Sequence, residues 1–299
     1  MQRRHFNTGL ALALGFALDR AIGQKILGPV PDDWRAIEKE SQGRLGVAML
    51  DTATGRLDGH RLDERFPMCS TFKWLLASAM LRQVADGHER LDRRIVYGKD
   101  ALLEYAPTTG KHVGGDGLSI AQLCEAAVTL SDNTAANLLL ASLGGPSAVT
   151  REARQLGDTA TRLDRQEPAL NTVPPGDSRD TTTPRAMSGA LRNAALGDGL
   201  PPAARAQLVA WMRATRTGLH RLRGGVPADW QGADKTGTGD VTANDVAVLW
   251  PPQRPPIVVA AFLTDCKASS DRRDATIAAV ARAVVARVQA VPGSRPMAQ

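Results

Sequence analysis

Residues 67–74 read PMCSTFKW and place Ser70 three positions before Lys73. The leading proline and the apolar residues around the pair predict a helix from about residue 70 to residue 86. Side chains three apart on a helix lie on one face, with Cβ atoms about 5–6 Å apart. Ser70 is therefore either a nucleophile beside its proton acceptor or an ordinary cap near a lysine that reaches solvent. Chance supplies such a pair in roughly a quarter of chains with this composition, so other stretches must decide.

Three further polar stretches have spacings that suit chemistry. Residues 131–133 (SDN) lie between two predicted helices, where a plain N-cap is the ordinary interpretation. Residues 235–238 (KTGT) open a predicted strand, and are either a turn or a cation, hydroxyl and flexible backbone suited to a substrate carboxylate. Glu167 and Asn171 lie four apart in a loop, where they either hold one water between them or are simply solvated. Chance produces the three short motifs together at a frequency on the order of a few in ten thousand.

Predicted strands occur at both ends of the chain. Residues 43–67 hold two short runs around the turn signal Thr54-Gly55. Three more runs, DKTGTGD, NDVAVLWP and PPIVVAAFLTD, lie near the other end, and a helix from 271 to about 290 follows them. The strands therefore predict one sheet assembled from the two ends of the chain.

The middle of the chain is predicted to be helical. Capping signals mark the helix starts, at Ser119, at Asp132 or Asn133, at Thr183-Pro184 and at Pro201-Pro202. We expect an α+β fold, in which residues 24–66 and 214–299 form a five-stranded antiparallel sheet with flanking helices and residues 67–213 form an inserted all-helical domain. Ligands favour the cleft between two such parts.

The segment between Gly157 and Asp180 contains Pro168, Pro174 and Pro175 and has little periodicity. A loop of this length in a compact domain is usually functional or disordered. Glu167 and Asn171 lie within it. From the positions that flank the loop, we hypothesise that Arg165 and Asp180 close it through an ion pair.

The first residues resemble an export signal rather than part of the fold. Basic residues 1–7 precede an apolar stretch at 8–18 that is too short to span a bilayer. Small residues at 21–23 suit cleavage before Gln24, and the run at 3–6 resembles a twin-arginine signal. We expect residues 1–23 to be removed and the mature protein to be periplasmic, without a membrane anchor.

The composition limits which kinds of partner and cofactor we expect. The net charge of +6 comes from arginines spread along the chain, with no basic run that would indicate nucleic acid. The histidines are scattered, so we expect no metal site and no cofactor. The odd cysteine count leaves at least one thiol free, and the apolar helical surroundings of Cys69 and Cys124 favour buried thiols. We expect a monomer.

The chain resembles the class A serine β-lactamases, and in particular the chromosomal penicillinases of Gram-negative bacteria. The four stretches occur in the order of that family. The resemblance covers nearly all of the mature chain and includes ERFPMCSTFK, SDNTAANLLL, RLDRQEPALN, DTTTP, VPADW and ADKTGTGD. It implies hydrolysis of the β-lactam amide bond of penicillins and cephalosporins through a serine acyl-enzyme, and hence antibiotic resistance.

The family's roles carry over residue by residue. The resemblance implies that Ser70 is the nucleophile and that the N–H groups of Ser70 and Thr238 form the oxyanion hole. It leaves Lys73 and Glu167 as alternative bases for acylation. The remaining implied roles are a water site (Glu167, Asn171), proton transfer to the lactam nitrogen (Ser131), the substrate side-chain amide (Asn133), a wall of the cleft (Tyr105) and the substrate carboxylate with its strand (Lys235, Thr236, Gly237, Thr238, Arg221).

The sequence also departs from the family. Many relatives carry an arginine on the strand after the KTG run, whereas this strand reads TANDVAVLW, and Arg221 is the compensating candidate. The positions that would pair with Cys69 and Cys124 in disulfides of some relatives hold Gly239 and Ala77. We therefore expect no disulfide and do not predict carbapenem hydrolysis. Gln166 replaces a common tryptophan before Glu167.

Two other functions fit part of this pattern. A penicillin-binding DD-peptidase would share the motifs around Ser70, Ser131 and Lys235 but would lack the loop acid and remain acylated. A β-lactam sensor domain would bind the drug covalently, without being an enzyme, and would need a membrane span. Glu167 with Asn171 favours the hydrolase over the first, and the short apolar run at the N-terminus disfavours the second.

Overall fold

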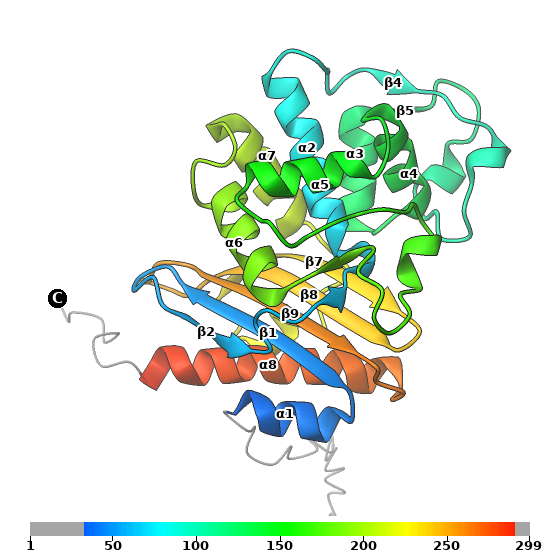
Figure 1. Cartoon of the computed structure of the whole chain (residues 1–299). Coiled ribbons are helices and arrows are strands. Elements are labelled where there is room, and N and C mark those ends of the chain that lie inside the picture. The colour runs from blue at the N-terminus through cyan, green and yellow to red at the C-terminus, as the bar shows by residue number, and fades with distance from the viewer. Residues whose placement is uncertain (1–32, 291–299) are drawn as a thin grey trace, which may run out of the picture.

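The computed structural model describes residues 33–290, so the predicted export signal at residues 1–23 lies outside the described part. Its centre is a five-stranded antiparallel sheet in the order β2-β1-β9-β8-β7 (Figure 1). The strands are β1 (Arg44–Asp51), β2 (Leu57–His60), β7 (Gln231–Gly239), β8 (Thr242–Trp250) and β9 (Ile257–Thr264). The prediction of one sheet built from both ends of the chain is confirmed.

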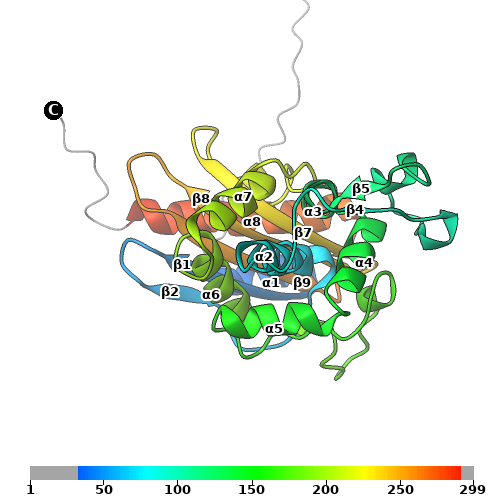
Figure 2. The same cartoon turned by 90° about the horizontal axis from the view of Figure 1, so that it is seen from above.

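Helices cover both faces of the sheet (Figures 1 and 2). One face carries α1 (Trp34–Ser41) and α8 (Ser270–Ala290). The other face carries the helices of the middle of the chain: α2 (Phe72–Ala85), α3 (Ile120–Thr129), α4 (Asn133–Ser142), α5 (Ser147–Gln155), α6 (Pro184–Ala195) and α7 (Pro202–Arg213). Two-residue strands pair as β3 (Phe66–Pro67) with β6 (Thr181–Thr182) and as β4 (Arg94–Ile95) with β5 (Leu118–Ser119).

The sheet separates two hydrophobic cores. On one face, Val259 of β9 packs with Trp34 of α1 and with Ile277 and Val284 of α8. Phe66, Trp74 and Phe262 belong to the larger core on the other face. Because β9 is covered on both sides, every one of its residues is buried, which explains its unbroken apolar sequence.

Three local predictions need correction or completion. Ser70 lies in a 3₁₀ turn (Cys69–Thr71), and α2 begins only at Phe72, two residues after the predicted start. Residues 235–238 occupy the second half of β7 rather than opening it, because pairing with β8 starts at Gln231. The predictions also missed the two-residue strands and the short helices α1 and α5, although both helices are amphipathic.

Other local predictions, on helix starts and on the cysteines, are confirmed. Ser119 accepts from the N–H of Gln122, whose side chain accepts from the N–H of Ser119, which completes the predicted capping box of α3. Asp132, and not Asn133, is the N-cap of α4. Cys69, Cys124 and Cys266 all lie in the described part, and all three are free and buried.

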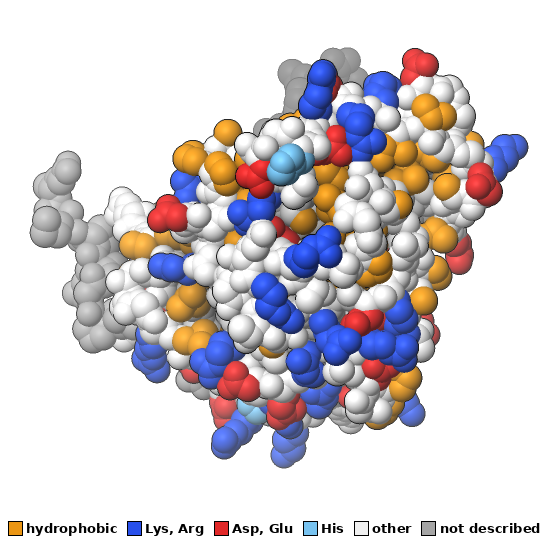
Figure 3. Space-filling view, turned by 45° about the horizontal axis from the view of Figure 1, so that its top comes forward, with side chains coloured by type: hydrophobic (Ala, Val, Ile, Leu, Met, Phe, Trp, Pro, Cys, Tyr) orange, Lys and Arg blue, Asp and Glu red, His pale blue; other side chains and the backbone are white. Residues whose placement is uncertain are grey.

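On the face shown in Figure 3, side chains of both charges are intermixed, with apolar patches between them. Across residues 33–290, no helix has the length and apolar character needed to cross a membrane. The same residues contain no group of three or more His, Cys, Asp or Glu side chains arranged to hold a metal ion.

Candidate active site

A cleft of about 350 Å³ lies between the helical part and the edge strand β7. It brings together segments far apart in the chain: the 3₁₀ turn, the loop before α4, the loop at 157–180, the loop after α7 and β7. Its lining consists of Ser70, Tyr105, Ser131, Asn133, Asn171, Thr217, Thr236 and Thr238. Seven of these eight residues were predicted from the sequence as site residues.

Ser70 is held at the floor of this cleft by an unusual backbone. Cys69 has a φ of 44°, a left-handed conformation that costs free energy for a residue with a side chain. The N–H of Met68 donates to the carbonyl of Asp180 at 3.0 Å, which fastens the turn to the end of the long loop. Ser70 is only 9% exposed, so its hydroxyl faces the cleft and little else.

Lys73 is fully buried, and three acceptors lie within 3.0 Å of its ammonium nitrogen. Its Nζ lies 2.9 Å from the carbonyl oxygen of Ser131, 2.6 Å from Oδ1 of Asn133 and 3.0 Å from Oε1 of Glu167. Burial lowers the pKa of Lys73, and the Glu167 carboxylate opposes that shift. An ammonium group has three donors and no acceptor, so these contacts match the charged form.

Glu167 connects Ser70 with this lysine. Its Oε1 accepts from the Ser70 hydroxyl at 3.2 Å and lies 3.0 Å from Lys73 Nζ, while Oε2 accepts from Asn171 Nδ2 at 2.6 Å. The backbone on either side is held by Asn137, whose Oδ1 accepts from the Glu167 N–H and whose Nδ2 donates to the Glu167 carbonyl. Three side chains thus hold the carboxylate, and a fourth holds the backbone that carries it.

The hypothesised ion pair at the ends of the loop is confirmed. Arg165 Nε lies 2.5 Å from Oδ2 of Asp180, which is completely buried. Asp180 Oδ1 also accepts from the N–H groups of Asp164 and Arg165, and Arg165 Nη2 donates to the carbonyl of Thr172. These contacts tie both ends of the loop to its middle.

Ser131 lines the cleft, and the fully buried Lys235 contacts it from outside the lining. Ser131 has a φ of 60°, a second left-handed position in the site. Lys235 Nζ donates to Ser131 Oγ at 3.1 Å and to the carbonyl of Thr236 at 2.8 Å. Burial, reinforced by the nearby charge of Lys73, lowers the pKa of Lys235 to about 7. The lysine is therefore poised to gain or lose its charge near neutral pH.

Arg221 lies behind β7 rather than in the cleft lining. It is 5% exposed, and Nη2 donates to Oγ1 of Thr238 at 2.8 Å. Nη1 donates to the carbonyls of Gly237 and Asn244, and Nε pairs with Asp274 at 2.7 Å. The predicted carboxylate-binding arginine thus reaches the cleft through the hydroxyl of Thr238.

Known proteins resemble the chain over most of its length. A family model described as the beta-lactamase enzyme family matches residues 30–288. The chain is 46% identical to beta-lactamase Toho-1 of Escherichia coli, with 85% of this chain and 88% of that protein covered. Both matches span most of the chain, and an identity of 46% is high enough to establish the shared family.

This chain belongs to the class A serine β-lactamases. A carbapenem-hydrolyzing beta-lactamase, KPC of Klebsiella oxytoca, is 45% identical over 85% of this β-lactamase and 87% of its own length. Among solved structures, an ancestral (GNCA) class A β-lactamase is 62% identical with a TM-score of 0.83, covering 85% of this chain and 97% of that one. The enzyme therefore hydrolyses β-lactams, and it has the fold of its class.

The sequence reading of this β-lactamase missed three residues around the site. Asn137 lies one helical turn after Asn133, a spacing that could have revealed its shared face. Thr217 lines the cleft, and its Oγ1 lies 2.6 Å from Oγ1 of Thr236, but nothing in its sequence surroundings marks it. For Asn244, the sequence predicts only a position in a strand.

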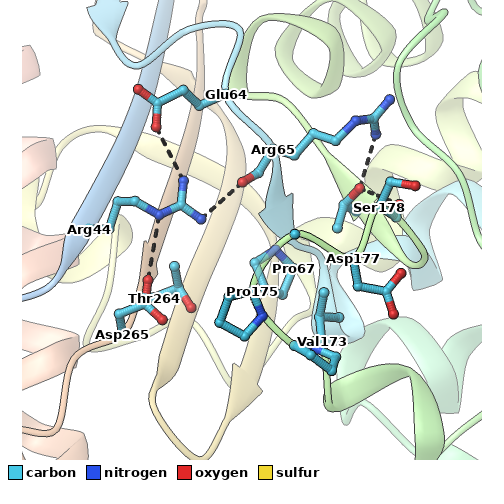
Figure 4. A pocket seen from close by; sticks show the side chains of 13 residues that line it. Arg44, Glu64, Arg65, Pro67, Val173, Pro175, Asp177, Ser178, Thr264 and Asp265 are labelled. Atoms are coloured by element: carbon cyan, nitrogen blue, oxygen red, sulfur yellow. Dashed lines mark hydrogen bonds and ion pairs between the residues drawn. The ribbon is translucent and has the colours of Figure 1, made fainter.

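A second hollow of about 460 Å³ lies apart from the cleft of this β-lactamase, beside residues 173–178 of the long loop (Figure 4). Arg44 extends into this region and makes ion pairs with Glu64 and Asp265. Pro67 and Pro175 form an apolar part of its wall. It shares no lining residue with the cleft.

Proposed function

We propose that this enzyme opens penicillins and cephalosporins through an acyl-enzyme on Ser70, with Glu167 as the general base. The observation that carries the proposal is the 3.2 Å contact between Ser70 Oγ and Glu167 Oε1. This distance is within reach of a direct proton transfer. Ser70 Oγ then attacks the lactam carbonyl, and its proton passes to Glu167.

The alternative base for acylation is Lys73. In the charged form, its three shortest contacts, to Ser131, Asn133 and Glu167, take all of its ammonium hydrogens and leave no lone pair for the Ser70 proton. We assign it an electrostatic role, in which its charge stabilises the Glu167 carboxylate and the negative charge that develops on Ser70.

The carbonyl oxygen becomes negative when the tetrahedral intermediate forms. We assign its stabilisation to the backbone N–H groups of Ser70 and Thr238, two residues that both line the cleft. The Ser131 hydroxyl, bound to Lys235 Nζ, is the group that gives a proton to the lactam nitrogen when the ring opens. Lys73 restores that proton to Ser131 and then takes from Glu167 the proton that came from Ser70, so the carboxylate is ionised again for deacylation.

The substrate carboxylate is assigned to the β7 side of the cleft, where Lys235 supplies charge and Thr236 and Thr238 supply hydroxyls, beside the backbone of Gly237. Because Arg221 Nη2 donates to Thr238 Oγ1, the Thr238 hydroxyl keeps its own hydrogen for the substrate. A charge-assisted hydrogen bond to a carboxylate is roughly twice as strong as a neutral one. Arg221 therefore acts through Thr238.

The substrate's side chain is assigned to the other side of the cleft. The Oδ1 of Asn133 accepts from Lys73, which leaves its amide hydrogens for the substrate's side-chain carbonyl. Tyr105 is 49% exposed, and its carbonyl accepts from the Asn133 N–H at 3.0 Å, so its ring can form a wall of the cleft. Glu167 with Asn171 then activates the water that releases the product.

A chromogenic cephalosporin separates this function from the two rivals. We expect steady colour development far beyond one equivalent of enzyme. A single burst equal to the enzyme concentration, with no further turnover, would instead indicate a DD-peptidase or a sensor domain.

We further propose that residues 1–23 direct export to the periplasm and are removed, and that the mature enzyme is a monomer. We also assign residues 24–66 and 214–299 to one domain and residues 67–213 to an inserted one, with the active site in the cleft between them. Mass spectrometry of the protein from a periplasmic extract should give a chain that starts near Gln24. Light scattering of the same sample should give the mass of one chain.

A further inference from the structure

Asn244, on β8, contacts both sides of the proposed oxyanion hole. One N–H of that hole belongs to Ser70 in the 3₁₀ turn, and the other belongs to Thr238 on β7. Asn244 is completely buried and pairs in the β7–β8 ladder with Gly237, the neighbour of Thr238. Its side chain extends toward the segment that leads into the turn.

The side-chain contacts of Asn244 are two hydrogen bonds from one amide group. Nδ2 donates to the carbonyl of Pro67 at 2.8 Å and to the carbonyl of Met68 at 3.1 Å. The Met68 carbonyl also accepts from the N–H of Thr71 at 3.2 Å, a bond that closes the turn around Ser70. The Oδ1 of Asn244 has no hydrogen-bond partner among the described residues, so the side chain acts as a donor.

The backbone of Asn244 is fixed on the other side. Arg221 Nη1 donates to the carbonyls of both Asn244 and Gly237, at 2.8 and 2.9 Å. A Cβ at Gly237 would lie 2.5 Å from the Met68 carbonyl oxygen, so β7 approaches the turn as closely as a glycine allows. One residue therefore links the strand of Thr238 with the turn of Ser70 at the point where they nearly touch.

We infer that Asn244 is a positioning residue that sets the spacing between the Ser70 and Thr238 N–H groups. The inference rests on the proposed function, because it presumes that these two groups hold the oxyanion. A misplacement of about 1 Å in a reacting geometry can cost roughly a hundredfold in rate. A purely structural Asn244 would instead affect thermal stability and leave the binding of tetrahedral adducts unchanged.

The test compares Asn244→Asp with Asn193→Asp. The first change keeps the shape but removes the two N–H donors toward Pro67 and Met68: an ionised carboxylate only accepts, and a protonated carboxyl group donates to only one of the two carbonyls. The control is the same substitution at a remote site, where Asn193 Nδ2 donates to the carbonyl of Leu156 at 2.8 Å. For each protein we would measure kcat and KM with a chromogenic cephalosporin, the inhibition constant of phenylboronic acid, and Tm. Phenylboronic acid forms a tetrahedral adduct with a serine hydroxyl, and one boron oxygen takes the place of the oxyanion.

For Asn244→Asp we expect kcat to fall about 10- to 100-fold and the boronate inhibition constant to rise by a similar factor, with KM changed by less than about threefold. Asn193→Asp should keep both constants whatever its effect on Tm. If Asn244→Asp does not fold, Asn244→Ser, which can donate to only one carbonyl, should give the same pattern with smaller factors. The inference is overturned if the folded variant keeps boronate affinity within about twofold of the wild type. Failure of the proposed function would look different, because the wild type itself would then not turn over or bind the boronate.

Discussion

Lys73 Nζ and Glu167 Oε1 lie 3.0 Å apart, and neither side chain is exposed to solvent. Each charge is thereby compensated by the other in a region where an isolated charge would be costly. The same carboxylate oxygen accepts from the hydroxyl of Ser70. The pair thus places a carboxylate beside the proposed nucleophile and opposes the effect of burial on the pKa of Lys73.

Removal of one member of this pair should destabilise the enzyme more than removal of both. Lys73→Met leaves the Glu167 carboxylate buried without its partner, and we expect a loss of about 3–5 kcal/mol in the free energy of unfolding. The double variant Lys73→Met, Glu167→Gln should recover much of that loss. Urea unfolding of the wild type, the two single variants and the double variant gives the coupling. If the losses of the two single variants simply add in the double variant, the two charges do not stabilise each other.

The activity toward carboxylate-bearing substrates should fall as the pH rises above 7. Burial lowers the pKa of Lys235 to about 7, so the free enzyme has the charged lysine below that pH and loses it above. The loss of charge should appear as a decrease in kcat/KM on the alkaline side. Lys235→Arg keeps its charge at all pH values, and its alkaline limb should be flat up to much higher pH. Identical profiles for both proteins would assign the limb to another group.

Thr217 should contribute to carboxylate binding through Thr236. Their hydroxyls lie 2.6 Å apart and share one hydrogen, which leaves the other hydrogen for a substrate. Thr217→Val keeps the shape and removes the hydroxyl, so we expect KM to rise about three- to tenfold with little change in kcat. A cephalosporin methyl ester, which lacks the carboxylate charge, serves as the control substrate. An equal effect on acid and ester would contradict this role.

The ion pair between Arg165 and Asp180 should hold the loop in the geometry that release of the product requires. Arg165→Gln removes the cation from a fully buried carboxylate, and we expect slower deacylation by roughly tenfold. Arg179→Gln is the matched control, because Arg179 pairs with Asp177 in the same loop while half-exposed. Single-turnover mass spectrometry measures the deacylation step in each variant. Equal deacylation rates in the two variants would contradict a specific role for the ion pair between Arg165 and Asp180.

The motifs predicted most of the cleft because each functional group lies within a short stretch of chain. The exact positions of the Ser70 and Lys235 stretches were not predicted, because the structure places them in the 3₁₀ turn before α2 and in the second half of β7. The role of Arg221 was less predictable. The sequence suggested a direct contact with the substrate carboxylate, but its engagement by Gly237, Asn244 and Asp274 depends on the packing of β7, β8 and α8.

Asn244 and Thr217 could not be found from spacing at all. Asn244 lies in a strand of alternating and apolar residues, and its two partners are more than 170 positions away. Thr217 lies in a loop whose course is set by the close approach of Gly218 to Asp234, where a Cβ would overlap the carboxylate. Both roles come from tertiary contacts, which a single sequence does not encode in a local pattern.

The most direct test of the central claim is the mass of Glu167→Gln after it is mixed with benzylpenicillin. In this variant Lys73 loses the carboxylate that opposed the effect of burial, so the pKa of Lys73 falls further and the neutral amine can accept the Ser70 proton. Deacylation has no such substitute. We predict that the full mass of the penicillin stays on the protein for many times the wild-type turnover time. Turnover as fast as in the wild type, with no adduct, would contradict the role of Glu167.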